Sequence, residues 1–357
     1  MIEVPRNVPT DVPMNVVDSQ GMFEAAASLP DQVREAALRS KGLDRLPNPS
    51  LIEQVVVLGM GGSGMAGEVV AAATAPLLPV PLVVSKSYEC PAFVGSGSLV
   101  FAISASGDTE ETVQATTDAA VAGAHLVVIT SGGKLGELAR GWDVPLVEVP
   151  RGIPQPRAAL GAMAIPPLVV LDQLGLYRGA QAWIDEAVDQ LSRRRDELAG
   201  AGESSAAADV ARRIGSTIAL VHGGGAVGAA AAQRLKTQIN ENAKAPAFWS
   251  VQPELCHNEI AGWGQHGDVT RQLITAVFLR HDGEHPQIGR RFELVGELLQ
   301  EVVAGEIEIQ AQGDGDLAQL FDLILFGDYV SLWMAAFAGI DPGPVPALVE
   351  LKQELGS

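Results

Sequence analysis

Cysteine and basic residues are both scarce in this chain of 357 residues. Cys90 and Cys256 lie far apart and outside any Cys-x-x-Cys spacing, so the sequence indicates neither a disulfide framework nor a structural zinc site. Cys256, His257 and His266 also lack a standard ligand spacing, so no metal is expected. Acidic residues outnumber basic ones by 43 to 24, for a net charge of −19. Such a charge repels nucleic acid and anionic membranes, and we expect neither as a partner.

Long apolar runs and a secretion signal are missing as well. No uninterrupted apolar run approaches the ~18 residues of a membrane span. The first stretch, MIEVPRNVPTDVPMNV, lacks the basic start and apolar core of a signal peptide. We therefore expect a soluble, cytoplasmic protein. The composition, 47% apolar and 19% charged, is typical of an α/β protein whose sheets are covered on both faces.

The order of apolar and helix-forming segments predicts two domains. In the first half, short β-branched runs alternate with helical segments, as in a doubly wound, mainly parallel sheet. After a small-residue break at residues 200–205, residues 217–243 repeat the order of strand, glycine turn and helix. We predict two tandem α/β domains, residues 1–200 and 206–357. The expected strands cover residues 55–58, 82–85, 99–104, 125–130, 145–149, 272–279 and 306–310, and expected helices cover residues 158–174, 293–303, 317–338 and 344–355.

The first glycine turn, VVVLGMGGSGMAGEVV, admits three interpretations. Gly59, Gly61 and Gly64 have the G-x-G-x-x-G spacing that marks the pyrophosphate turn of a dinucleotide site. Such a site also needs an acidic residue about 20 positions on, where this chain has Ser85 and Lys86. The glycines therefore either permit close packing of strand and helix or place a different anion at a helix N-terminus.

A second loop, AISASGDTEETVQAT, is rich in hydroxyl groups. Ser104, Ser106 and Thr109 surround Gly107 between a predicted strand and a predicted helix. Three hydroxyls and the N–H groups of a helix start can bind one phosphate dianion, whereas ordinary helix capping needs only one hydroxyl. Ser63, at the neighbouring strand end, is a candidate fourth contact, because parallel strands present their carboxyl ends at one edge of the sheet.

Four residues are candidates for proton chemistry. Glu241, near the end of an alanine-rich helix, can remove a proton from a carbon next to a carbonyl. Arg157 can neutralise an enediolate oxygen, and His257 can move protons during the opening of a pyranose ring. On spacing alone, His257 can equally be a hydrogen-bonded structural residue, and Arg157 and Lys352 can be ordinary surface residues.

Taken together, these stretches resemble the bifunctional phosphoglucose/phosphomannose isomerases, a branch of the sugar isomerase (SIS) superfamily. The resemblance extends from about residue 55 to the C-terminus and follows the order of the family's motifs. It implies two SIS domains, a homodimer, and an active site between domains and subunits that needs neither metal nor cofactor. The matching segments are GMGGSGMAGE, ISASGDTEET, GIPQPRAALG, KTQINENAKAPAF, PELCHNEIAGW and GDYVSLWMAAFAGIDPGPVPALVELKQEL.

The resemblance also implies a role for each candidate residue. Glu241 would move the proton between C2 and C1, and Arg157 would stabilise the cis-enediol(ate). His257, supplied by the partner subunit, and Lys352 would assist ring opening. The residues implied for the phosphate are Ser63, Ser104, Ser106 and Thr109, with Gly61 and Gly62 in the substrate loop.

The implied reaction interconverts glucose 6-phosphate and/or mannose 6-phosphate with fructose 6-phosphate, since a planar enediol retains no configuration at C2. Two positions depart from the family pattern: Asp108 replaces the usual Asn, and Gly343 replaces a common Thr. Asp108 places a carboxylate near the expected phosphate. It motivates the alternative hypothesis of a non-catalytic or substrate-diverged regulatory protein that has the SIS fold and binds sugar phosphates.

Overall fold

The chain forms two compact units in the computed structural model, which describes residues 16–355. The N-terminal unit is Leu29–Val188, and the C-terminal unit combines residues 16–28 with Asp189–Leu355. Each unit is described by itself. Residues 1–15, which we expected from the sequence not to form a signal peptide, lie outside the described residues.

The helix break expected from the sequence is present between the two halves of the chain. Helix α7 (Ala180–Ala201) ends at the expected position, a short 3-10 turn (Gly202–Ser204) follows, and α8 begins at Ala206. The Ser205 hydroxyl caps α8 by accepting the Ala208 N–H. The domain limits predicted from the sequence, 1–200 and 206–357, stay a prediction.

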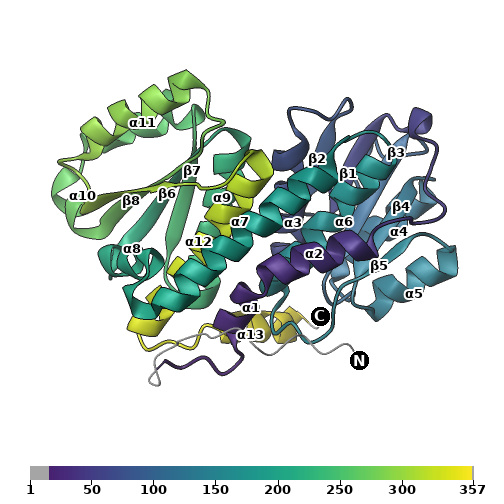
Figure 1. The fold of residues 1–357 in the computed structure, drawn as a ribbon, viewed down its shortest axis with the longest axis horizontal. Helices are drawn as coiled ribbons and strands as arrows, with labels where there is room; N and C mark the ends of the chain where they lie inside the picture. The colour runs from purple at the N-terminus through teal and green to yellow at the C-terminus, as the bar shows by residue number, and fades with distance from the viewer. Residues whose placement is uncertain (1–15, 356–357) are drawn as a thin grey trace. The chain divides into compact units, whose positions relative to one another are not determined.

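The N-terminal unit contains a five-stranded parallel sheet with the order β2-β1-β3-β4-β5 (Figure 1). All five strands were expected from the sequence. They are β1 (Gln54–Leu58), β2 (Leu82–Ser85), β3 (Ser98–Ser104), β4 (His125–Thr130) and β5 (Leu146–Glu148). The helical segments are α2 (Leu29–Arg39), the 3-10 turn Pro49–Leu51, α3 (Gly61–Thr74), α4 (Glu110–Val121), α5 (Gly133–Trp142), the 3-10 turn Pro156–Ala159 and α6 (Leu160–Gln173).

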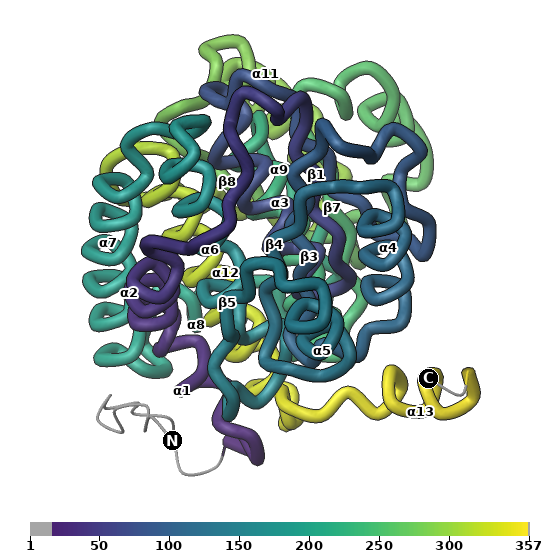
Figure 2. The backbone as a smooth tube through the Cα atoms, turned by 90° about the vertical axis from the view of Figure 1, so that its right-hand side faces the viewer, coloured from purple at the N-terminus to yellow at the C-terminus, as the bar shows by residue number. Residues whose placement is uncertain are grey.

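Both faces of this sheet are covered, as its apolar strands require. Val56 and Val100 pack against Ala115 of α4 on one face. On the other face, Gly67 of α3 lies so close to β1 that an added Cβ atom would be 2.9 Å from a Val57 methyl carbon. Figure 2 shows α4 on one side of β3 and β4, and α6 and α2 on the other. The turns that follow β1 and β3 therefore open at the same edge of the sheet.

The C-terminal unit contains a four-stranded parallel sheet with the order β7-β6-β8-β9. Its edge strand β7 was not expected from the sequence. The strands are β6 (Ile218–Gly224), β7 (Ala247–Gln252), β8 (Ile274–Arg280) and β9 (Gly305–Gln310). The helical segments are α1 (Met22–Ala27), α8 (Ala206–Ile214), α9 (Gly225–Gln238), the π turn η4 (Ile239–Ala243), the 3-10 turns η5 (Glu254–His257) and η6 (Glu259–Gly264), α10 (Gly267–Leu273), α11 (Pro286–Leu299), α12 (Asp316–Phe337) and α13 (Pro346–Leu355).

Helices cover both faces of the second sheet as well (Figure 1). Phe278 of β8 stacks on His222 of β6 with ring centroids 5.4 Å apart and also packs against Phe292 of α11. On the opposite face, α9 lies against β6: a Cβ atom added to Gly223 would be 2.0 Å from the Gly228 carbonyl oxygen. Gly223, Gly225 and Gly228 repeat the G-x-G-x-x-G spacing of the first turn, and here the spacing serves close packing of strand and helix.

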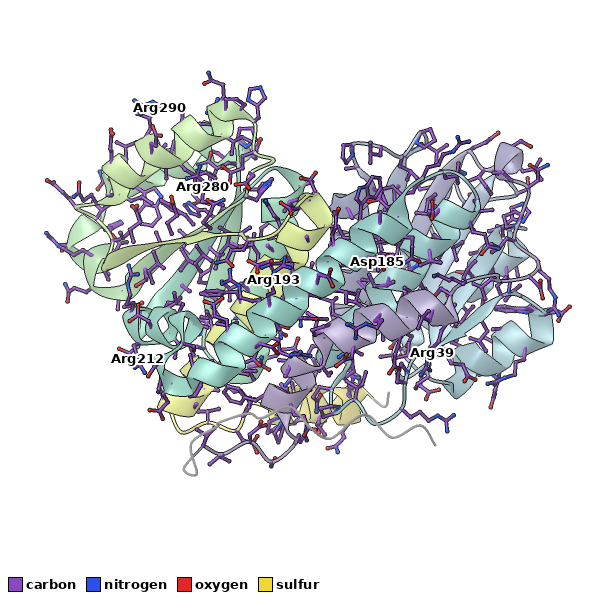
Figure 3. All side chains as sticks on the ribbon, viewed as in Figure 1. Arg39, Asp185, Arg193, Arg212, Arg280 and Arg290 are labelled. Carbon is purple, nitrogen blue, oxygen red and sulfur yellow. The ribbon has the colours of Figure 1, made fainter. Side chains whose placement is uncertain are left out.

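Helix α12 is long and apolar enough to cross a membrane, yet 89% of its most apolar 18-residue stretch is buried inside the structure. Its two buried aspartates form ion pairs with arginines of the same unit: Asp322 with Arg194 at 2.8 Å, and Asp328 with Arg234 at 2.7 Å. Gln190 also donates to Asp322, and Arg193, labelled on α7 in Figure 3, donates to Gln190. The helix is the core element of the unit.

Removal of Asp322 tests the contribution of these buried pairs. Asp322→Ala leaves the Arg194 guanidinium, whose side chain is only 4% exposed, without its main counter-charge. We expect the free energy of unfolding to fall by about 3–5 kcal/mol in urea titrations. Glu197→Ala is the matched control, because Glu197 pairs with the same arginine but is 52% exposed, and it should cost less than about 1 kcal/mol. Equal losses in the two variants would contradict this view of the core.

Candidate functional site

The loop between β3 and α4 holds two of the predicted hydroxyls in contact with each other. Ser104, fully buried at the end of β3, accepts the Gly107 N–H at 3.0 Å, and its Oγ lies 3.0 Å from the Thr109 Oγ1. Thr109 occupies the N-cap position of α4, but its hydroxyl makes no capping bond to the described residues of that helix. The plain capping interpretation is therefore wrong for Thr109. The N–H groups in the first turn of α4, which have no acceptor within the helix, receive none from the Thr109 hydroxyl.

Gly107 allows this loop to pack against the loop that precedes α5. Its φ of +83° is left-handed, and an added Cβ atom would lie 1.9 Å from the Gly132 carbonyl oxygen. No other residue fits there without a backbone shift. Ser106, next to Gly107, is exposed, and its hydroxyl accepts the Asp108 N–H at 3.2 Å.

The Asp108 carboxylate has a structural partner. Its Oδ1 accepts the Lys134 N–H at 2.8 Å, in the first turn of α5. An asparagine at position 108 would offer an equivalent acceptor atom. The departure from the family pattern therefore preserves a contact at the helix start and adds a negative charge beside the hydroxyl loop.

The turn between β1 and α3 is joined to the hydroxyl loop through Ser63. Gly61 begins α3 with a left-handed φ of +52°. Ser63 is 5% exposed, and its Oγ accepts the Ala105 N–H at 3.3 Å and donates to the Met163 sulfur at 3.3 Å. The structure thus brings Ser63 to the loop of Ser104, as the strand order predicted.

Arg157 lies against the same turn. It belongs to the 3-10 turn Pro156–Ala159 before α6 and is 2% exposed. A Cβ atom added to Gly62 would be 3.0 Å from the Arg157 Cα, so Gly62 is needed for this approach. At the end of β2, where a dinucleotide enzyme carries an acid, Lys86 forms an ion pair with Glu68 of α3. This pair disfavours the dinucleotide interpretation.

In the C-terminal unit, Glu241 lies in a π-helical turn that directly follows α9. Such turns are rare and occur frequently at functional sites. Asn240 donates to the Ala245 carbonyl at 2.9 Å, and the fully buried Asn242 donates to the Ser331 hydroxyl at 2.9 Å. Both sequence neighbours of the half-buried Glu241 are therefore anchored.

His257 is exposed at the end of turn η5, which the buried Leu255 anchors in the core. Two residues on, Glu259 accepts a hydrogen bond from the Ser250 hydroxyl and approaches the His222 Nε2 at 3.3 Å. Burial raises the pKa of the Glu259 carboxyl, but the His222 ring and the Ser250 hydroxyl outweigh burial, so the pKa lies below its ordinary value. These contacts, which sequence reasoning missed, tie the His257 segment to β6 and β7.

Lys352 lies on α13, none of whose residues, all of them described, is buried. The segment before α13 contains Gly343, whose N–H donates to Asp341 Oδ1 at 3.1 Å. A Cβ atom added to Gly343 would lie 2.8 Å from the Gln20 Cβ. A threonine at position 343 would thus require Gln20 to shift.

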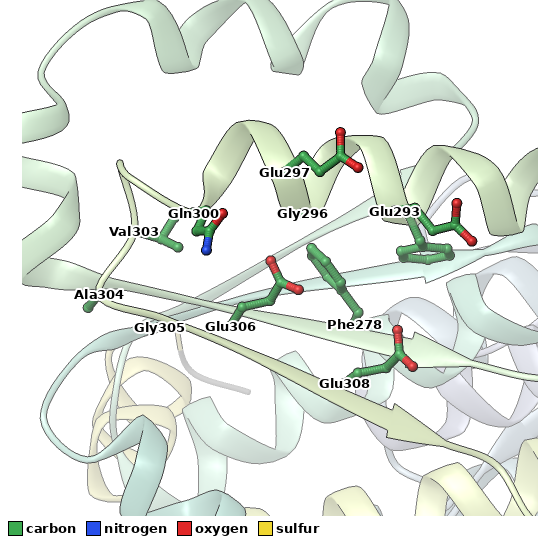
Figure 4. A pocket seen from close by; sticks show the side chains of 11 residues that line it. Phe278, Glu293, Gly296, Glu297, Gln300, Val303, Ala304, Gly305, Glu306 and Glu308 are labelled. Atoms are coloured by element: carbon green, nitrogen blue, oxygen red, sulfur yellow. The ribbon is translucent and has the colours of Figure 1, made fainter.

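A cavity of about 520 Å³ lies between α11 and strands β8 and β9 (Figure 4). Four glutamates line it: Glu293, Glu297, Glu306 and Glu308. Burial, and then the charge of Glu308, raise the pKa of Glu306. These carboxylates repel a phosphate, and none of the predicted site residues lines the cavity. Among residues 16–355, no cluster of three His, Cys, Asp or Glu side chains suits a metal ion.

Comparisons with known proteins agree with the two sheets. The family model described as SIS domain matches residues 52–144, and the one described as bacterial phospho-glucose isomerase C-terminal SIS domain matches residues 203–355. The C-terminal domain of glucosamine-fructose-6-phosphate aminotransferase from Francisella tularensis has a similar fold: TM-score 0.66 at 17% identity, covering 92% of this chain and 98% of that one. The protein is thus a tandem SIS-domain protein of the sugar isomerase class.

Sequence relatives identify the branch. A bifunctional phosphoglucose/phosphomannose isomerase from Caldicellulosiruptor bescii is 35% identical over 336 residues, covering 94% of this chain and 98% of the relative. One from Aquifex aeolicus is 33% identical over 302 residues, covering 84% and 90%. The chain belongs to the bifunctional phosphoglucose/phosphomannose isomerase family. The resemblance drawn from the sequence motifs is confirmed, and so is the isomerase class.

Substitution of Asp108 separates its helix contact from its charge. Asp108→Asn keeps an acceptor for the Lys134 N–H and removes a negative charge, so inorganic phosphate should bind about three- to tenfold tighter at low ionic strength. Asp108→Ala loses the acceptor and should cost about 0.5–2 kcal/mol of stability. Calorimetric phosphate titration and urea unfolding measure the two effects. Weaker phosphate binding by Asp108→Asn would count against a phosphate in this loop.

The lowered pKa of Glu259 predicts a pH-dependent contribution to stability. The ionised carboxylate stabilises the fold above its unfolded pKa, near 4.5, and this contribution disappears as the pH falls through the lower folded value. Glu259→Gln should therefore lower the free energy of unfolding by about 1 kcal/mol at pH 6–7, and by progressively less below pH 4.5. Glu254→Gln, an exposed neighbour, is the control. A difference that grows toward acid pH would contradict the assignment.

Proposed function

We propose that the protein interconverts glucose 6-phosphate and/or mannose 6-phosphate with fructose 6-phosphate through a metal-free cis-enediol(ate). The observation that carries the proposal is the β3–α4 loop of this family member. There the N-cap hydroxyl of Thr109 turns to Ser104 and away from its own helix. Such a loop presents hydroxyls and a helix start to one anion.

The phosphate is held by neutral donors. With a net charge of −19, the chain offers no general attraction for a dianion, so the site depends on local hydroxyl and N–H groups. The partial positive charge at the N-terminus of α4 favours the anion, and the glycine turn lets the backbone approach the phosphate. The proposed contacts are Ser63, Ser104, Ser106 and Thr109, with Gly61 and Gly62 in the turn.

Glu241 is the proposed base. It removes the C2 proton of the open-chain aldose, the C–H electron pair becomes the C1–C2 double bond, and O1 takes up the charge or a proton. Arg157 stabilises this oxygen. Return of the proton to C1 and loss of the O2 proton give the ketose. Rotation about C2–C3 lets the same base serve both aldoses.

His257 and Lys352 are proposed to open the sugar ring, a step that needs proton transfer between the ring oxygen and O1. His257 is exposed on its turn. We propose a homodimer in which His257 enters the active site of the partner subunit, a cytoplasmic location, and no cofactor. The alternative hypothesis of a non-catalytic regulator rested on Asp108. Because Asp108 accepts the Lys134 N–H, it has a structural role, and its presence no longer favours that alternative.

Isotope exchange tests the proposal. Purified protein with fructose 6-phosphate in deuterated buffer containing EDTA should produce glucose 6-phosphate, mannose 6-phosphate or both, each with deuterium at C2. Mass spectrometry and NMR report the label. Absence of both aldoses and of any label would refute the isomerase assignment for this chain.

Glu241→Gln is the companion variant. Loss of the base should lower kcat by about 10²–10⁴-fold, with phosphate binding and the melting temperature unchanged. Glu254→Gln, a conservative change at an exposed residue of the same unit, controls for the loss of one carboxylate. Full activity of Glu241→Gln would assign the base to another residue.

A further inference from the structure

Lys244, three residues after Glu241, directs its ammonium group at backbone carbonyls from two segments. Its Nζ lies 2.8 Å from the Glu241 carbonyl oxygen and 3.3 Å from that of Asn242, at the end of the π turn. It also lies 2.9 Å from the Asp341 carbonyl oxygen and 3.1 Å from that of Pro342. An ammonium has three N–H donors, so these four acceptors saturate it. Hydrogen bonds from a charged donor are about twice as strong as neutral ones.

The backbone of Lys244 is unusual for a lysine. Its φ of +54° is left-handed, at the position that caps the π turn, where glycine or asparagine is the ordinary residue. A side chain with a Cβ atom is strained in this conformation. A glycine would cap the turn more easily, so the reason for a lysine is its side chain.

The segment that Lys244 contacts is itself held in place. The Asp341 carboxylate accepts the N–H groups of Ser19 and Gly343, at 3.4 and 3.1 Å. Asp341 and Pro342 follow α12 and lead into α13, which carries Lys352. Lys244 therefore fastens the Glu241 turn to a segment that is anchored independently.

We propose that Lys244 is a positioning residue for Glu241, an inference that rests on the proposed isomerase function. Its ammonium faces backbone carbonyls, so it holds the turn and takes no proton from the substrate. A base must be placed within about 0.5 Å of its productive position. Without the clamp the π turn keeps its anchors at Asn240 and Asn242 but loses the one at its C-terminal end.

Lys244→Gly separates positioning from ordinary capping. Glycine adopts the left-handed conformation without strain, so the melting temperature should stay within about 3 °C of the wild type. We expect kcat to fall about 10- to 100-fold with KM within twofold. The deuterium isotope effect on kcat with 2-deuterated glucose 6-phosphate should rise, because proton removal becomes rate-limiting. Lys244→Arg, which keeps a cationic donor, should recover part of the loss.

Arg45→Gly is the matched control, because Arg45 is another cation at a left-handed position, with a φ of +63° and an exposed ion pair to Asp143. It should leave kcat unchanged. Unchanged kcat and isotope effect in Lys244→Gly would overturn the inference, as would an activity loss that only follows a loss of folded protein. Wild-type protein without exchange at C2 would instead refute the proposed function.

Discussion

The buried ion pair between Arg234 and Asp328 is the interaction on which the C-terminal unit depends. Arg234 lies on α9, Asp328 lies on α12, and both are nearly inaccessible to water. A carboxylate or a guanidinium buried alone would cost several kcal/mol, so the pair fixes the register of the two helices. The Asp328 carbonyl accepts the Ser331 hydroxyl, which accepts from Asn242 beside Glu241. The place of the candidate base thus follows from the packing of α9 on α12.

The negative charge of the chain imposes a second constraint. A protein with 19 excess acidic residues cannot recruit a phosphate with a basic surface, and a phosphate site must be built from neutral donors and helix ends. In the N-terminal unit, hydroxyl groups and a helix start come together where Ser63 and Ser104 accept backbone N–H groups around the start of α4. The acidic cavity beside α11 shows the contrast, because its four carboxylates exclude the same ligand.

The sequence predicts much of this architecture because strand order and hydroxyl spacing are local signals. Strands β2 and β4 begin and end where the apolar runs predicted. Strand β7 escaped prediction because it is an edge strand with Phe248 and Trp249 exposed, inside a stretch that appeared polar. The Lys244 clamp and the contact between Glu259 and His222 also escaped, since each joins residues far apart in sequence. A lysine a few residues beyond an alanine-rich helix gives no sign of a left-handed backbone.

The two glycine turns show why a motif alone does not determine a function. Both have the same G-x-G-x-x-G spacing between a strand and a helix. In the second, Gly223 and Gly228 are in contact, and the glycines allow β6 to pack closely on α9. In the first, a Cβ atom added to Gly64 would likewise lie only 2.8 Å from the Gly59 carbonyl oxygen, but Gly62 and Ser63 stand where the second turn has Ala226 and Val227. Gly62 admits the backbone of a buried arginine, and Ser63 reaches the neighbouring loop. The two turns therefore share the motif glycines and differ in the residues between them.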